Sequence, residues 1–150
     1  MIVIRPAVAE EIAAAHCVAE SSFAELRRVY VPRTAANDDS EFSRVVAVSD
    51  GQIVGTVSYA IQSGQLHLRE LAVDAQHRRK GVARAIVGYL AELASAAACW
   101  TMSLYTIAQT GNVAVFERLG FRTVTEEPAI WAVSPGGKEL IEVLMERPID

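Results

Sequence analysis

Residues 71–84 read LAVDAQHRRKGVAR, and this stretch decides the fold. Its apolar beginning is typical of a strand, and the residues from Val82 onward follow a helical pattern. Between them lies a cationic turn with one glycine, Gly81. Four of the seven residues 78–84 are basic, whereas an even spread of the Lys and Arg residues would place about 0.65 there. The turn therefore concentrates positive charge where a strand passes into a helix.

The start of that helix favours an anion. The first N–H groups of a helix have no partner within it, and the helix dipole adds about half a positive charge. Basic side chains add charge-assisted hydrogen bonds, but they oppose the dipole at roughly 0.3–1 kcal/mol per charge when no anion is bound. The alternatives are a solvated basic helix start or a small nucleic-acid patch. We expect the turn to bind phosphate.

Composition sets the broad class. A chain of 150 residues, 51% of them hydrophobic, is expected to fold as a single domain over residues 1–150, because a chain of this size buries roughly 70% of its unfolded surface. Its net charge of −4 argues against nucleic acid as a partner. No apolar run approaches the ~20 residues of a membrane span, and residues 1–6 are too short for a secretory signal. We therefore expect a cytoplasmic location and no membrane association.

The two cysteines, Cys17 and Cys99, lie within apolar helical patterns, with no Cys or His at ligand spacing. This favours buried thiols over a disulfide or a metal site.

Before the turn, the sequence predicts short helices and two hairpins. The dipeptides Asp50-Gly51 and Ser63-Gly64 favour tight turns between strands. Residues 32–40 form a polar stretch. Helices are expected over Val8–His16 and Ser21–Tyr30, and strands over Ile2–Arg5, Val45–Val48, Ile53–Ile61 and Gln65–Val73.

After the turn, a long helix is expected, whose apolar face is marked by Val82, Ile86, Leu90, Leu93 and Ala97. Asn112 is a candidate N-cap for a helix through Val113–Leu119, with Gly120 as its C-terminal glycine. Strands are expected over Trp100–Ile107, Phe121–Thr125 and Glu139–Glu146, with an irregular loop over Pro128–Gly137. Hairpins followed by alternating strands and helices predict an α+β fold with a mixed sheet.

These residues resemble a known family. Arg78, Gly81 and Ala83 match the motif Gln/Arg-x-x-Gly-x-Gly/Ala of the GNAT-type N-acetyltransferase superfamily, in its strand–turn–helix setting. About thirty residues later, residues 112–121 read NVAVFERLGF and are similar to a second family segment. The resemblance covers roughly residues 43–147. It implies a three-layer α/β/α domain with a mixed, mostly antiparallel and splayed central sheet.

The resemblance also implies a cosubstrate and its binding residues. In the family, acetyl-CoA (acetyl coenzyme A) places its pyrophosphate on the N–H groups of the cationic turn, and its pantetheine arm pairs like an added strand with the residues before it. No metal is implied. The residues that would bind the cosubstrate are Leu71, Ala72, Val73, Arg78, Arg79, Lys80, Gly81, Val82, Ala83, Arg84, Asn112 and Phe116.

The implied reaction is direct attack of a primary amine, of a small molecule or a protein, on the thioester in a ternary complex. His67 occupies the position of a family base, and an imidazole with a pKa near 6.5 suits the task. Glu70 is the other candidate base, although strand alternation places residues 67, 69, 71 and 73 on one face and Glu70 on the other unless a bulge shifts them. A bulge near Val73 would free its N–H to bond the thioester oxygen.

One departure from the family pattern is Phe116, which stands where many members have a tyrosine that protonates the leaving thiolate. Tyr105 or a water could replace it, and Phe116 is otherwise interpreted as a packing residue. A non-catalytic acyl-CoA-binding sensor therefore remains an alternative function, and a nucleic-acid-binding protein a distant third. Neither Gly-x-Gly-x-x-Gly nor Gly-x-x-x-x-Gly-Lys-Ser/Thr occurs.

The amine is expected to enter between residues 23–33 and 126–137, where Phe23, Tyr30 and Trp131 are candidate lining residues. Glu126 and Glu127 near this entrance would suit a cationic amine. A homodimer is possible on this fold, with the closing strand Glu139–Glu146 as one contact edge.

Overall fold

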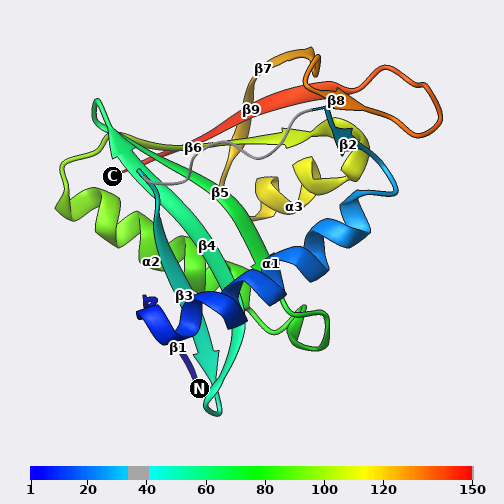
Figure 1. Cartoon of the computed structure of the whole chain (residues 1–150). Helices are drawn as coiled ribbons and strands as arrows, with labels where there is room; N and C mark the ends of the chain where they lie inside the picture. Colours follow the sequence, from blue (N-terminus) through cyan, green and yellow to red (C-terminus); the bar gives the residue numbers. More distant parts are fainter. Residues whose placement is uncertain (34–40, 150) are drawn as a thin grey trace.

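The computed structural model describes residues 1–33 and 41–149 (Figure 1). In chain order, the elements are β1 (Ile2–Pro6), η1 (Ala9–Glu11), α1 (Ile12–Leu26), β2 (Val31–Pro32), β3 (Ser43–Ser49), β4 (Gln52–Gln62), β5 (Gln65–Val73), η2 (Ala75–His77), α2 (Val82–Ala96), β6 (Thr101–Ile107), η3 (Ala108–Thr110), α3 (Asn112–Arg118), β7 (Arg122–Pro128), β8 (Ala132–Val133) and β9 (Ile141–Pro148).

The central sheet is mixed. In the described residues it contains seven strands in the order β1-β3-β4-β5-β6-β9-β7. Its pairs are antiparallel except β5–β6, which is parallel and is connected through α2. Both predicted hairpin turns form, with positive φ at Asp50, Gly51, Ser63 and Gly64, as a type I′ turn requires. The expected mixed, mostly antiparallel sheet is confirmed.

Helices cover both faces of this sheet. α1 crosses one face over β4 and β5, and α2 packs on the same strands from the other face (Figure 1). The strands alternate accordingly. Val45 and Ala47 join Ile86 and Leu90 of α2 in the main core, while Val46 between them is equally buried and faces the opposite way. The three-layer α/β/α arrangement is thus confirmed.

The parallel pair opens along its length. β5 and β6 pair only over Gln65–His67 and Thr101–Ser103, and the last residues of β5 have no neighbouring strand on that side within the described structure. The sheet is therefore splayed at Leu71–Val73, immediately before the cationic turn, as expected.

The N-terminal region differs from expectation. One helix, α1, replaces the two predicted over Val8–His16 and Ser21–Tyr30, because no glycine or proline interrupts residues 12–26 and alanine is frequent among them. Cys17 lies on its exposed side, so the prediction of two buried thiols is wrong for Cys17 and right for Cys99; both are free. Most of the polar stretch 32–40 lies outside the described residues.

The C-terminal half brings two further corrections. The closing strand β9 is not an edge, because it lies between β6 and β7, and it cannot offer the contact edge expected of Glu139–Glu146. The expected loop Pro128–Gly137 contains β8, which pairs with β2.

Of the two residues predicted to end α3, the N-cap is wrong and the C-terminal glycine is confirmed. Asn112 does not cap α3; its N–H donates to Thr110 Oγ1 at 3.2 Å, and Gly111 is the N-cap. Gly120 has the positive φ of a C-terminal glycine, as predicted.

None of the helices in the described residues combines the length and apolarity that crossing a membrane requires. In the same residues, no group of three or more His, Cys, Asp and Glu side chains is arranged to hold a metal ion.

Candidate active site

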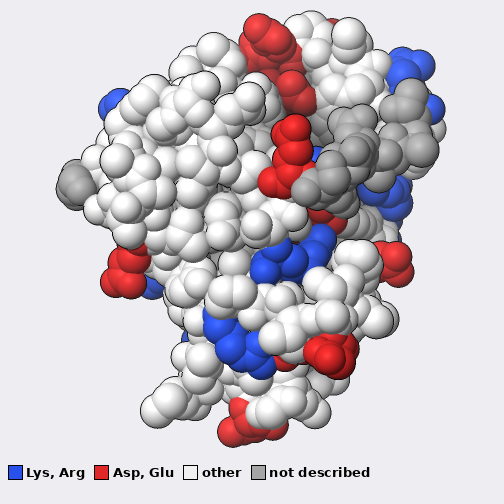
Figure 2. Space-filling model, turned by 60° about the vertical axis from the view of Figure 1, so that its left-hand side comes forward, with Lys and Arg blue, Asp and Glu red and all other residues white. Residues whose placement is uncertain are grey.

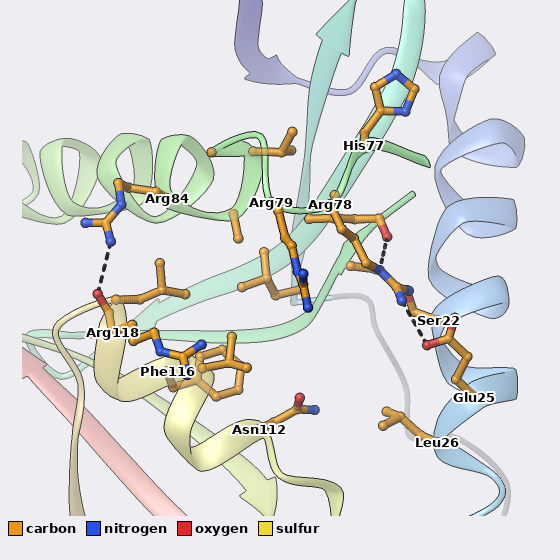
Figure 3. Close-up of a pocket in the computed structure, with 18 of the residues that line it drawn as sticks. Ser22, Glu25, Leu26, His77, Arg78, Arg79, Arg84, Asn112, Phe116 and Arg118 are labelled. Carbon is orange, nitrogen blue, oxygen red and sulfur yellow. Dashed lines mark hydrogen bonds and ion pairs between the residues drawn. The ribbon is translucent and has the colours of Figure 1, made fainter. Parts of the chain in front are cut away.

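A cavity of about 570 Å³ lies at the point where β5 and β6 diverge (Figure 3). Its size is in the range of small-molecule sites. The walls come from the C-terminal half of α1, the end of β5, the cationic turn with the start of α2, and α3. The lining residues are Ser22, Phe23, Glu25, Leu26, Leu71, Ala72, Val73, His77, Arg78, Arg79, Gly81, Val82, Ala83, Arg84, Asn112, Val115, Phe116, Arg118 and Leu119.

The backbone of the turn depends on Gly81. This residue is the N-cap of α2 and has a φ of +82°, a conformation that glycine adopts without the steric cost of a side chain. A Cβ built on Gly81 would have no protein atom within 4 Å. The backbone at Gly81 is therefore open on the side where a side chain would lie, at the end of α2 whose first N–H groups have no partner within the helix.

Positive charge is concentrated around this opening. Four arginines and one glutamate line the cavity, giving it a formal charge of +3 in a chain whose net charge is −4. Figure 2 shows that basic side chains also gather near the centre of one face of the molecule, with acidic ones largely around them. The charge distribution suits a polyanionic ligand.

Arg78 connects the turn to two other elements. Its Nη1 donates to Glu25 Oε2 of α1 at 3.0 Å, and its Nε donates to the Val73 carbonyl at 3.3 Å. The pair joins α1 to the end of β5 at one end of the cavity (Figure 3).

A β-bulge lies within β5. The β4–β5 register shifts between Thr56 and Ser58, whose partners are Ala72 and Arg69, and Glu70 has a φ of +58°. Left-handed backbone at a residue other than glycine is strained and is frequent at functional sites. The bulge was expected near Val73, and it is found at Glu70–Leu71 instead.

The bulge changes the face on which Glu70 lies. Its carboxylate is 3.6 Å from Nη2 of Arg44 and 3.7 Å from Nε of Arg69. Simple alternation would have placed Glu70 opposite Arg69, so the extra residue brings the two to one face. The carboxylate of Glu70 is therefore already paired with two guanidinium groups.

His67 lies four residues earlier on β5, in a half-buried aromatic setting. Its Nδ1 is 3.1 Å from Ser103 Oγ of β6, and its ring packs against Phe42 and Tyr105, with centroids 6.4 and 5.5 Å away. Burial lowers the pKa of His67 below its usual 6.5. The imidazole is therefore neutral at pH 7 and able to accept a proton.

The structure divides the predicted site residues into two groups. All the predicted cosubstrate-binding residues except Lys80 line the cavity. His67, Glu70 and Tyr105 lie outside that lining, with Tyr105 56% exposed. Phe116 is in the cavity wall and contacts Phe121 edge-on.

Several lining residues were missed from the sequence. Ser22, Glu25 and Leu26 come from α1, which the sequence presents as a generic amphipathic helix. Arg118 lies in the last turn of α3, where a cation also suits the helix dipole, so its type alone gives no functional signal.

The two segments expected to flank the amine do meet. β2 pairs with β8, and Tyr30 contacts Trp131 edge-on at 5.6 Å. The Trp131 indole N–H donates to the Glu142 carboxylate of β9. Phe23 lines the 570 Å³ cavity instead.

Comparison with known proteins identifies the family. The model of the Acetyltransferase (GNAT) family matches residues 9–121. A rat protein, "N-acetyltransferase family 8 member 3", is 33% identical over 88 residues, which cover 54% of this chain and 39% of that protein. The chain therefore matches about two fifths of that relative's length.

Solved structures share the fold. The ribosomal-protein-S18-alanine N-acetyltransferase of Escherichia coli superimposes with a TM-score of 0.76 at 19% identity, over 100% of this chain and 95% of that one. An aminoglycoside 6′-N-acetyltransferase, solved in complex with coenzyme A, gives 0.72 at 17% identity, over 99% and 97%. With the family model matching most of the sequence, the chain belongs to the GNAT acetyltransferase family.

Proposed function

We propose that residues 1–150 form a single catalytic domain that transfers an acetyl group from acetyl-CoA to a primary amine. The observation that carries this proposal is the juxtaposition of the splayed end of β5 with the glycine-opened, arginine-rich turn in one cavity. The first feature suits the extended pantetheine arm, and the second suits the pyrophosphate.

The residues present fit this cosubstrate. The space beside Gly81 that a Cβ would enter is empty of protein, and the cavity's positive charge complements phosphate. Leu71 and Val73 would hold the arm through their backbone. Acetyl-CoA supplies the activated acetyl thioester; the chain orients it and handles the proton.

His67 is the proposed base. Donation from Nδ1–H to Ser103 Oγ would leave the Nε2 lone pair to accept a proton from the amine, directly or through water. Its lowered pKa keeps it neutral at physiological pH. Glu70 is the weaker candidate, because Arg44 and Arg69 engage it.

Stabilisation of the thioester oxygen is assigned to a backbone N–H near the bulge. A bulge releases ladder groups from strand pairing, so the amides of Leu71 and Val73 are the candidates. For the departing thiolate, Tyr105 is the proposed proton donor, because its ring contacts that of His67.

The proposal is tested with the full chain, acetyl-CoA and a panel of small primary amines and peptide N-termini, by following release of the coenzyme A thiol. Amine-dependent thiol release is expected. Tight binding of acetyl-CoA by calorimetry with no release for any amine would contradict catalysis and support the sensor alternative.

A matched pair of glycine variants tests the binding site. Gly81 and Gly51 both have positive φ and open space around the Cβ position, so alanine strains each backbone by a similar amount, about 1–2 kcal/mol. Only Gly81→Ala should weaken acetyl-CoA binding, because Gly51 lies in the β3–β4 turn. Equal acetyl-CoA affinity in the two variants would contradict the proposed pyrophosphate site at Gly81.

A further inference from the structure

An arginine near the expected amine entrance has a buried N–H group without a partner. Arg27 is the C-cap of α1. Its Nη1 atom is buried, and no oxygen in the described residues accepts a hydrogen bond from it. A buried donor that has given up its bonds to water and gained none in return carries a free-energy penalty, which is larger when the donor is charged. The fold by itself leaves this penalty at Arg27 uncompensated.

Two ordinary explanations account for only part of the side chain. A cation at the end of a helix is favoured by the helix dipole. The Arg27 Cζ atom also lies 5.8 Å from the ring centroid of Phe23 and 5.2 Å from that of Tyr30, within the range of cation–π contacts. Both interactions require only a positive charge, and neither provides an acceptor for the buried N–H. The acceptor would therefore come from a ligand.

The surroundings of Arg27 indicate which ligand this is. Phe23, one of the two rings, lines the cavity of about 570 Å³. Tyr30, the other ring, contacts Trp131 edge-on at 5.6 Å, where the two segments expected to flank the amine meet. Arg27 itself is absent from the cavity lining, and its side chain as a whole is only half-buried, so a ligand can approach it from solvent. Arg27 therefore lies beside the region expected to hold the acceptor.

We propose that Arg27 binds a carboxylate of the acceptor, so that the substrates are amines that also carry a carboxylate group, as amino acids do. A guanidinium group donates two parallel N–H bonds to a carboxylate, which supplies the missing oxygen at Nη1. This inference rests on the proposed function and names its substrate class. Because Arg27 would hold the end of the acceptor that does not react, it determines specificity and is not a catalytic residue.

A zwitterionic acceptor also agrees with the acidic residues expected near the entrance. Glu126 and Glu127 would suit the ammonium group of such a molecule, and Arg27 its carboxylate.

The inference is tested by comparing glycine, leucine, phenylalanine and lysine with their α-carboxamides as acceptors, in the thiol-release assay with the full chain. Each amide keeps the amine and the side chain of its amino acid and lacks the carboxylate charge. That charge raises the pKa of the neighbouring amine, so intrinsic reactivity at neutral pH favours the amides. A preference for the free amino acid therefore reports recognition of the carboxylate.

The wild type should have a kcat/KM that is ~10–100-fold higher for at least one amino acid than for its amide, as charge-assisted hydrogen bonds predict. Arg27→Gln should lose this preference through a higher KM for the amino acid, with kcat little changed, because the contact is the same in the ground state and the transition state. Arg27→Lys should keep only part of the preference, since lysine lacks the planar fork. Arg28→Gln is the matched control, because Arg28 is the next residue and is exposed, and it should behave like the wild type.

A second measurement does not depend on acetyl transfer. Arg27→Met keeps an apolar side chain against the two rings and removes the unpartnered N–H, so its urea midpoint should be at or above that of the wild type. A lower midpoint would show that Arg27 serves the fold and would contradict the inference.

The kinetic outcomes separate the inference from the proposed function. Amine-dependent thiol release with no preference for any amino acid over its amide would contradict the carboxylate site and leave the proposed function standing. An undiminished preference in Arg27→Gln would contradict the role of Arg27. Binding of acetyl-CoA by the folded wild type with no release for any amine would contradict the proposed function itself, and the inference with it.

Discussion

Replacing Gly55 by alanine should destabilise the protein and displace the helix that follows the cationic turn. Gly55 lies in β4, beneath the first turn of α2. An added Cβ would be 2.9 Å from Val82 Cγ1, 3.0 Å from Ile86 Cδ1 and 3.3 Å from the Ala72 carbonyl oxygen. Carbon atoms in good contact are about 3.5–4.0 Å apart, so the overlap with Val82 is about 0.6 Å or more.

The loss of stability depends on which atoms can move to relieve this overlap. The Ala72 oxygen is backbone in the sheet and cannot retreat without breaking strand pairing, so α2 must shift outward. Val82 and Ile86 are 2% and 0% exposed, and overpacking at such a site costs about 1–3 kcal/mol. Because Val82 directly follows Gly81, the same shift should move the turn and weaken acetyl-CoA binding.

The assay is urea denaturation of Gly55→Ala, with acetyl-CoA affinity measured by calorimetry. Adding Val82→Ala removes the methyl group that the new Cβ meets first, so the cost of Gly55→Ala should be smaller in the Val82→Ala background. Gly88→Ala is the control, because a Cβ at Gly88 in α2 meets nothing within 4 Å and should stabilise by about 0.5–1 kcal/mol. Wild-type stability of Gly55→Ala, or an equal cost in both backgrounds, would refute the steric argument.

Three further predictions concern the chemistry and the N-terminal region. For His67, burial lowers the pKa, so kcat/KM of the wild type should fall on the acid side only below pH 6.5. The variant His67→Gln should lose this pH dependence and have a kcat/KM lower by ~10²–10⁴-fold. Full activity of His67→Gln across pH would contradict a role for His67 as base. Phe116→Tyr should supply a proton donor and raise kcat, by up to ~10²-fold, with little change in acetyl-CoA affinity; an unchanged kcat would show that leaving-group protonation is not limiting. Glu11 accepts two 2.6 Å bonds from Arg5 and one from the Val8 N–H, and the Arg5 bonds chiefly lower its pKa from 4.5 to about 2. Because the folded-state pKa is depressed, this stabilisation is present above pH 4.5 and is lost as pH falls toward 2, so the difference in Tm between wild type and Glu11→Gln should shrink over that range; a constant difference would contradict the linkage.

Locally encoded features were predictable. The strand over Gln65–Val73 has the predicted bounds, and the helix that follows begins at Val82 as expected. The hairpin turns and the glycine at the end of α3 also depend on a few adjacent residues with particular backbone preferences.

The candidate site was only partly predictable. The motif residues of the turn were found because their spacing reflects a local backbone shape. The face on which Glu70 lies was not predictable. A bulge depends on the register between β4 and β5, and the sequence of one strand does not indicate where it occurs. The sequence pattern also suggested a break in α1 that the alanine-rich helix does not have.

By itself, the sequence determined the alternation of strands and helices from β3 onward, the cationic turn and the family to which they point, because each depends on neighbouring residues. Only the tertiary structure decided that β9 lies inside the sheet, that Glu70 turns toward Arg44, and that Arg118 joins Arg84 at the cavity. These features arise from contacts between residues 13 to 47 positions apart. At such separations, the pairing and packing of whole elements select one arrangement among many that the local sequence allows.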